Sequence, residues 1–146
     1  MTAEHGYAKF EHGFPLPAHA SPAAIRACLD AGDIERFDRD YAAALEGARE
    51  SLDLTGLFDT LTQWRHTADR ALLPDGRVPV RCVLLFGDEA RLVTPWHLGR
   101  DLLRLPASVI ARACDMPPNE LPGRYFTAAG GRDDLHDFRL VNDPRL

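Results

Sequence analysis

The chain has 146 residues, of which 45% are hydrophobic and 27% charged, a composition typical of one ordinary globular domain. The sequence contains no run of 18 or more apolar residues, which excludes a membrane-spanning helix. The net charge is −5, and the acidic excess lies in residues 33–73, which hold nine acids and five arginines. This excess disfavours non-specific nucleic-acid binding by that segment and favours a basic protein partner.

The cysteines, the basic residues and the first residues of the chain support further expectations. Cys28, Cys82 and Cys114 are far apart and odd in number, which predicts partly buried thiols rather than a disulfide framework or a metal site. No cofactor is expected. Sixteen of the basic residues are arginine, with Lys9 the only lysine, a bias that suggests a high-GC bacterium. The first residues lack a basic segment followed by an apolar core, so a cytoplasmic location is the default expectation.

Residues 1–20 contain glycines and prolines without a helical or strand period, which predicts a flexible N-terminal arm. Histidines recur there at a spacing of seven, at His5, His12 and His19. A metal-binding tail is the alternative interpretation, but the glycines and prolines argue against one shared helix face.

The next segment, residues 21–73, is predicted to hold about three helices. Ser21-Pro22 is a helix start signal, because serine caps and proline fits the first helical position. Asp33 is expected to cap the following helix, and Ser51 to Asp53 to end it. Two apolar stripes at steps of three or four residues support the two longer helices. Their positions are Ile34, Phe37, Tyr41, Leu45 and Ala48, then Leu54, Leu57, Phe58, Leu61, Trp64 and Ala68.

Residues 78–141 are predicted to form a β-hairpin with one or two short helices. The apolar runs at 78–86 and 90–94 flank a short Gly-Asp-Glu loop, a hairpin pattern. Leucine spacing favours a helix at 97–105, and Pro106 is placed to open another. A short strand is expected at 135–141. The fold class is therefore α+β, with residues 21–146 as one small domain whose two parts share a core.

No catalytic signature is present: the chain has no P-loop, no HExxH and no GxSxG segment. The favoured function is a non-enzymatic interaction protein whose acidic helices present side chains to a basic protein partner. Trp and Arg are common interface anchors, and the predicted contact residues are Tyr41, Trp64, Arg65, Asp38 and Glu46. A homo-oligomer stays open as an alternative.

A DNA-binding regulator using residues 97–124 is the second hypothesis. Residues 109–121 faintly resemble the first helix and turn of a helix-turn-helix, although the doubled proline restricts a second helix. Arg100, Arg104 and Arg112 are the candidate phosphate contacts. Nucleic-acid binding is not favoured.

A third hypothesis is a small enzyme or ligand binder. His97 stands at a strand-to-helix junction beside Trp96, and His136 belongs to the acid-rich run 133–137. Acids with a histidine perform acid–base work or bind a divalent ion. This hypothesis requires that the two histidines meet at one pocket.

Three segments carry a family resemblance: PAAIRACL at 22–29, FDRDYAAAL at 37–45 and LTQWR at 61–65. With them, residues 22–73 resemble an actinobacterial, antitoxin-like domain family of unknown function. The resemblance implies a role as partner of a small toxin of the RelE/ParE type, without an active site. Members of that family usually end soon after the Trp-Arg helix, whereas this chain continues.

Overall fold

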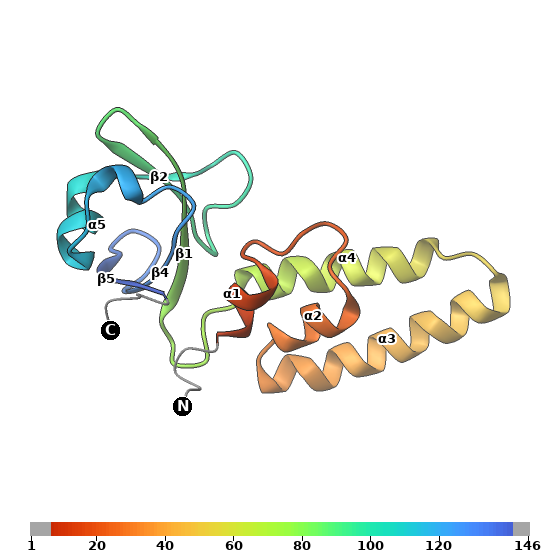
Figure 1. Cartoon of the computed structure of the whole chain (residues 1–146). Coiled ribbons are helices and arrows are strands. Elements are labelled where there is room, and N and C mark those ends of the chain that lie inside the picture. The colour runs from red at the N-terminus through yellow and green to blue at the C-terminus, as the bar shows by residue number, and fades with distance from the viewer. Residues whose placement is uncertain (1–6, 142–146) are drawn as a thin grey trace.

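The computed structural model describes residues 7–141 and combines helices with one antiparallel sheet, which confirms the α+β mix. Figure 1 shows the helices at one end of the molecule and the sheet at the other. The helical end consists of α1 (Ala8–His12), α2 (Pro22–Ala27), α3 (Ala31–Ser51) and α4 (Thr55–Arg70). The sheet end consists of β1 (Val78–Phe86), β2 (Glu89–Val93), β3 (Leu103–Pro106), α5 (Ala107–Cys114), the 3-10 helix η2 (Pro118–Glu120), β4 (Tyr125–Ala129) and β5 (His136–Leu140).

The N-cap of α2 is the residue that the sequence predicts, whereas the N-cap of α3 lies three residues earlier. Ser21 caps α2 as predicted, because its side chain accepts a hydrogen bond from the amide of Ala24 at 3.1 Å and proline occupies the first position. The cap of α3 is Asp30 rather than Asp33, since Asp30 Oδ1 accepts from the Asp33 amide at 2.8 Å. The helix therefore begins one turn earlier than the pattern predicts, and Gly32 lies inside its first turn.

Helices α3 and α4 form a long antiparallel hairpin that projects away from the sheet (Figure 1). The predicted break is confirmed: α3 ends at Ser51, and Leu52 adopts a left-handed conformation with φ of 59°. Asp53 then accepts hydrogen bonds from the amide and the hydroxyl of Thr55 at 3.0 and 2.8 Å, which fixes the start of α4. No described helix is both long and apolar enough to cross a membrane.

The sheet has the strand order β3-β2-β1-β4-β5, and every neighbouring pair is antiparallel. The predicted hairpin is its centre: β1 and β2 pair through Phe86 and Glu89 across a two-residue turn, where Gly87 has φ of 63°. The sheet curls around a core that α5 covers (Figure 1). Alternate residues of β1, Val78, Val80 and Cys82, point into that core.

The helix predicted at 97–105 is wrong. Gly99 has φ of 70°, which a right-handed helix does not tolerate, and the chain turns there before it enters β3. In β3, Leu103 and Leu105 pack against the core of the sheet, and Arg104 between them points the other way. Pairing with β2 thus selects the period of two over the helical spacing of Leu98, Leu102 and Leu105. The short strand predicted at 135–141 is confirmed as β5, and β4 was not predicted.

The described part of the expected flexible arm, residues 7–20, is packed rather than loose. It contains α1, and Phe10, Phe14 and Leu16 are buried. Phe14 precedes a cis proline, and the turn places its ring against the rest of the chain. Glycines and prolines here make a tight turn, which the composition alone does not distinguish from disorder. His5 lies outside the described residues.

Buried side chains of the described residues form three clusters. One lies between the sheet and α5, and one lies between α2, α3 and α4 around Phe37 and Trp64. The third joins the two ends of the molecule: Phe10 and Phe14 meet Leu73 and Val93, with the Tyr125 ring 4.9 Å from that of Phe10. The N-terminal segment is therefore a wedge between the helices and the sheet.

Lys9 fastens this wedge to the end of α4. It is only 4% exposed, and its Nζ donates to the carbonyl of Ala68 and, at 2.7 Å, to that of Ala71. Carbonyls at the end of a helix lack the amides of a following turn, so the ammonium supplies the Ala71 carbonyl with a donor and the Ala68 carbonyl with a second one, beside the Ala71 amide at 3.2 Å. Burial lowers the pKa of Lys9 to about 8. Next to it, Asp69 accepts the amide of Leu16 at 2.8 Å, and desolvation raises the pKa of that carboxyl.

We predict that Lys9→Met lowers the free energy of unfolding by about 1–3 kcal/mol, because the Ala71 carbonyl loses its donor and the Ala68 carbonyl keeps only the Ala71 amide. Urea titration followed by far-ultraviolet circular dichroism measures it. The unfolded chain keeps the lysine proton up to the ordinary pKa of 10.5, while the folded chain releases it near 8. The wild type therefore gains stability relative to the variant as pH rises through this window.

Glu11→Met on the exposed side of α1 is the matched control, with an expected change within about 0.5 kcal/mol. An equal loss of stability in the two variants would show that Lys9 contributes nothing beyond α1 itself.

Candidate protein-interaction surface

Trp64 is a core residue rather than a surface anchor. Its side chain is 7% exposed, its ring meets that of Phe37 edge-on at 5.8 Å, and its Nε1 donates to Asp40 at 3.0 Å. A buried indole with a satisfied N–H holds the hairpin together. The tryptophan predicted to contact a partner is thus available only if the helices separate.

The other predicted contact residues are more accessible. Tyr41 is half-buried, and its ring stacks on Phe37 with the centroids 5.6 Å apart. Asp38 is exposed and forms a two-pronged ion pair with Arg26 of α2, at 2.8 and 3.0 Å. The hydrogen bond from Arg26 keeps the pKa of Asp38 below its ordinary value. Glu46 is exposed. Asp38 therefore already has a partner within the chain.

Large apolar side chains gather on the half of the hairpin remote from the sheet. Their exposed fractions run from 42% for Leu45 to 88% for Leu52, with Leu54 and Phe58 between. Ordinary surface apolar residues are scattered singly, whereas clustered ones mark interaction sites. We call this surface the distal face, and its members are Tyr41, Leu45 and Leu52 of α3 and its C-cap, and Leu54, Phe58 and Leu61 of α4 and its N-cap.

The distal face and α2 lie on the same side of the hairpin. Helix α2 covers the part nearer the sheet, and the distal face is the part beyond it. On α3, Leu45 is seven residues from Asp38, the partner of α2, so the two share a face. On α4, Phe58 and Leu61 line a recess together with Ile25 of α2. Figure 1 shows α2 beside the proximal half of the hairpin, with no helix beside the remainder. One apolar stripe is thus covered by α2 at one end and exposed at the other.

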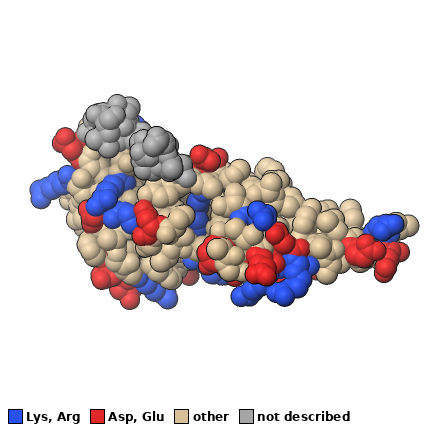
Figure 2. All heavy atoms as spheres, turned by 90° about the horizontal axis from the view of Figure 1, so that it is seen from below, with Lys and Arg blue, Asp and Glu red and all other residues tan. Residues whose placement is uncertain are grey.

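The distal half of the hairpin is also acidic. Residues 41–62 hold four carboxylates and one arginine, Arg49, whose guanidinium lies 3.5 Å from Glu46. Figure 2 shows acidic atoms gathered at the free end of the molecule beside a smaller basic group. The carboxylates are Glu46, Glu50, Asp53 and Asp59. A partner with positive charge around an apolar centre fits this surface.

Arg65 marks the boundary between the covered and the exposed parts of the stripe. It lines the recess formed by residues 18–22, Ile25, Phe58 and Leu61. Its Nε is buried and has no hydrogen-bond partner among the described residues. The guanidinium of Arg65 therefore adds a positive charge to the wall of an otherwise apolar recess.

The three arginines proposed to contact nucleic acid do not form one basic helix face. Arg100 lies in the turn before β3. Arg104 points away from the core on β3, opposite Arg91 of β2. Arg112 is exposed on α5, which covers the core side of the sheet. Arg104 and Arg112 therefore extend from opposite sides of the sheet.

The segment that faintly resembles a helix-turn-helix has a different arrangement. Helix α5 ends at Cys114, and Asp115 follows with a φ of 51°. The next elements within the described chain are η2 and the strand β4 rather than a second α-helix. Ile110 and Cys114 of α5 are buried in the sheet core, so this helix has a packing role.

His97 and His136 have separate local partners. His97 Nδ1 is 2.8 Å from the hydroxyl of Thr94, and His136 Nδ1 is 2.7 Å from the carbonyl oxygen of Asp134. His97 follows β2 and His136 begins β5, and β1 and β4 lie between these strands. Within residues 7–141, no group of three or more His, Cys, Asp or Glu is arranged to hold a metal ion.

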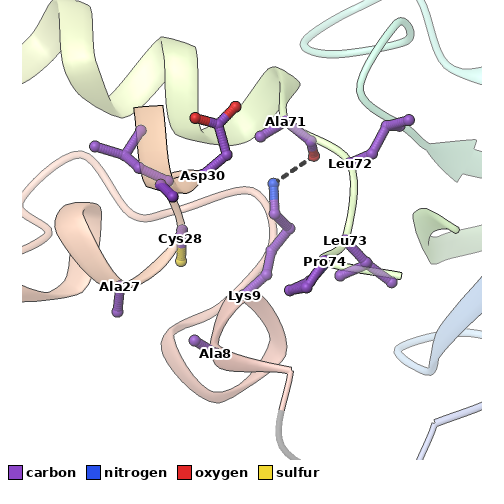
Figure 3. Close-up of a pocket in the computed structure, with 11 residues that line it drawn as sticks. Ala8, Lys9, Ala27, Cys28, Asp30, Ala71, Leu72, Leu73 and Pro74 are labelled. Atoms are coloured by element: carbon purple, nitrogen blue, oxygen red, sulfur yellow. Dashed lines mark hydrogen bonds between the residues drawn. The ribbon is translucent and has the colours of Figure 1, made fainter. Parts of the chain in front are cut away.

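A second recess lies between α1, the turn from α2 to α3, and the segment after α4. It encloses about 570 Å³, and Figure 3 shows the amine of Lys9 within it, directed at the carbonyl of Ala71. Burial raises the pKa of the neighbouring Cys28 thiol to about 11, so this thiol is protonated at neutral pH and a weak nucleophile. In this recess, the amine of Lys9 donates to the carbonyls at the end of α4.

Part of the chain matches a known protein family. Residues 13–79 match DUF6247, a family of unknown function. The match includes the stretch 22–73 in which the resemblance was recognised, and it covers α2, α3 and α4 up to the first residues of β1. No curated protein and no solved structure matches the chain.

The apolar stripe of the sequence includes Phe58 and Leu61 as well as Trp64, and the composition of interface anchors favours Trp64 among them. Leu52 and Leu54 were not chosen, although a pair of leucines in an acidic helix turn, flanking Asp53, is a usable signal. Leucines in a solvent-exposed turn contribute little to a core, so their exposure points to another surface.

We predict that Trp64→Ala costs about 3–5 kcal/mol of unfolding free energy, because it leaves a cavity against Phe37. Trp64→Phe is expected to cost less, since it keeps a ring and loses chiefly the bond to Asp40. Chemical denaturation measures both. Trp96→Phe is the control for the loss of a tryptophan elsewhere; a Trp64→Ala variant as stable as the wild type would contradict the core assignment.

Proposed function

We propose that this chain is a non-enzymatic protein-interaction module, the antitoxin-like member of a bacterial two-component pair. The observation that carries the proposal is the distal face: several large apolar side chains exposed together on the part of the acidic helical hairpin that α2 leaves uncovered. The family resemblance of residues 22–73 supports the antitoxin-like role. The partner is a basic protein, as the charge of the hairpin favours.

Burial of the exposed apolar side chains by a partner would stabilise the complex. Covering a leucine or phenylalanine side chain that starts exposed contributes about 1.5–3 kcal/mol before the costs of association. Leu45, Leu52, Leu54 and Phe58 together therefore provide an interface centre, and the surrounding carboxylates form its polar rim. Tyr41 and Arg65 lie where the rim meets α2. Trp64 supports the surface from beneath.

We predict that Leu45→Ser with Phe58→Ser abolishes capture of a stoichiometric partner when the full chain is co-expressed with the product of the adjacent gene. We expect the fold to be retained because both side chains are exposed, to 42% for Leu45 and 57% for Phe58. Affinity capture and circular dichroism on the same samples measure the two effects.

Phe86→Ser is the matched control, because this phenylalanine is 70% exposed on the β1–β2 hairpin, away from α3 and α4. Equal capture by the wild type and the Leu45/Phe58 variant would refute the distal face as the binding surface. The absence of any stoichiometric partner would refute the proposed function itself.

A further inference from the structure

We infer that the distal face receives a basic amphipathic helix of the partner, lying beyond the end of α2 and parallel to α4. This inference rests on the proposed interaction function and specifies the shape, charge and direction of what binds. It is a protein helix of stated chemistry rather than an extended strand or a second copy of this chain.

The way α2 packs shows what shape fits the stripe. Ile25 of α2 is 1% exposed and contributes to the cluster built on Phe37 and Trp64. The N-terminal end of α2 lies at the recess that Phe58 and Leu61 line. A helix in line with α2 would place its own apolar residues, at steps of three and four, over Leu45, Phe58 and Leu61. Helix-in-groove binding uses this pattern of anchors.

Charge selects a basic helix and disfavours self-association. Residues 41–62 carry four carboxylates against one arginine. Two copies joined through this face would bring like charges together around the interface, whereas lysines or arginines flanking an apolar stripe would meet the carboxylates. Oppositely charged rims also make the association weaken with salt.

The two ends of the stripe differ, and this difference sets the direction. Glu50 and Asp53 lie toward the free end of the hairpin, where they favour the positive N-terminal end of a bound helix. At the other end, the positive charge of the Arg65 guanidinium, which lines the recess beside Phe58 and Leu61, favours the free carbonyls of a helix C-terminus. Helix α4 runs from the free end toward the sheet, so the bound helix runs parallel to it.

The test uses a stapled helical peptide of about 14 residues, which spans roughly 21 Å of helix. Its leucines occupy one face and its lysines the other. One comparison peptide has the same composition with the leucines scattered, and another carries glutamate in place of lysine. Binding to the full chain is followed by fluorescence anisotropy at two salt concentrations. A nitroxide at either peptide end locates each end by broadening of amide signals in nuclear magnetic resonance spectra.

We predict that only the amphipathic lysine peptide binds, that salt weakens it, and that Leu45→Ser with Phe58→Ser weakens it about tenfold or more. The N-terminal nitroxide is expected to broaden amides near Asp53, and the C-terminal one those of residues 18–22 and Arg65. Phe86→Ser leaves binding unchanged. Arg65→Gln weakens binding and reduces the preference for this direction.

Equal binding of the scattered or the glutamate peptide overturns the inference, as does the reverse direction or a dimer in sedimentation that the Leu45/Phe58 variant abolishes. Absence of peptide binding, with capture of the co-expressed partner still dependent on Leu45 and Phe58, refutes the helix and leaves the proposed function in place. Absence of both refutes the two together.

Discussion

The packing of the N-terminal wedge against the end of α4 is the constraint on which the arrangement of this molecule depends. Lys9 satisfies two carbonyls at the end of α4, and Phe10 and Phe14 fill the space between that end and the sheet. The amine is held there because carbonyls at the end of a helix lack the amides of a following turn and accept from it. Without this wedge, the helices and the sheet would be connected mainly by the short segment before β1.

Anchoring at one end explains why the other end of the hairpin is free. The cluster around Phe37 and Trp64 fixes the proximal half of α3 and α4 with the help of α2. Helix α2 is only six residues long, so it covers only part of the stripe. The remainder of the hairpin has an apolar stripe that no neighbouring helix of the described chain covers, and Leu45 and Phe58 are exposed on it. The proposed interface is therefore a consequence of a short α2 beside two long helices.

The match to the family of unknown function ends where the sheet begins, at residue 79. It includes the helices that form the distal face, and it leaves out Lys9, Phe10 and nearly all of the sheet. The part of the chain that resembles other proteins is thus the part to which we assign binding. The sheet and α5 form a separate buried cluster around Ile110 and Phe126.

Local signals predicted the elements that local chemistry fixes. Ser21-Pro22 starts a helix, and Gly87 closes a hairpin, because each acts through its own backbone conformation and nearest neighbours. The helix predicted at 97–105 is wrong because Leu98, Leu102 and Leu105 fit a helical spacing over so few residues, and pairing with β2 selects a strand instead. The composition of residues 1–20 predicts a flexible arm, because glycines and prolines alone do not distinguish tight turns from disorder.

The sequence by itself determined the α+β class, the acidic helical hairpin with its wide apolar face, and the lack of a recognisable catalytic motif. Only the tertiary structure decided which apolar residues remain in solvent. Trp64 and Phe58 share the same helix and the same stripe, but Trp64 meets Phe37 and Asp40, whereas Phe58 lies at the edge of the part that α2 covers and stays 57% exposed. Periodicity states which side of a helix is apolar. How far along that side another element extends depends on contacts between residues distant in the chain, here between α2 and the hairpin.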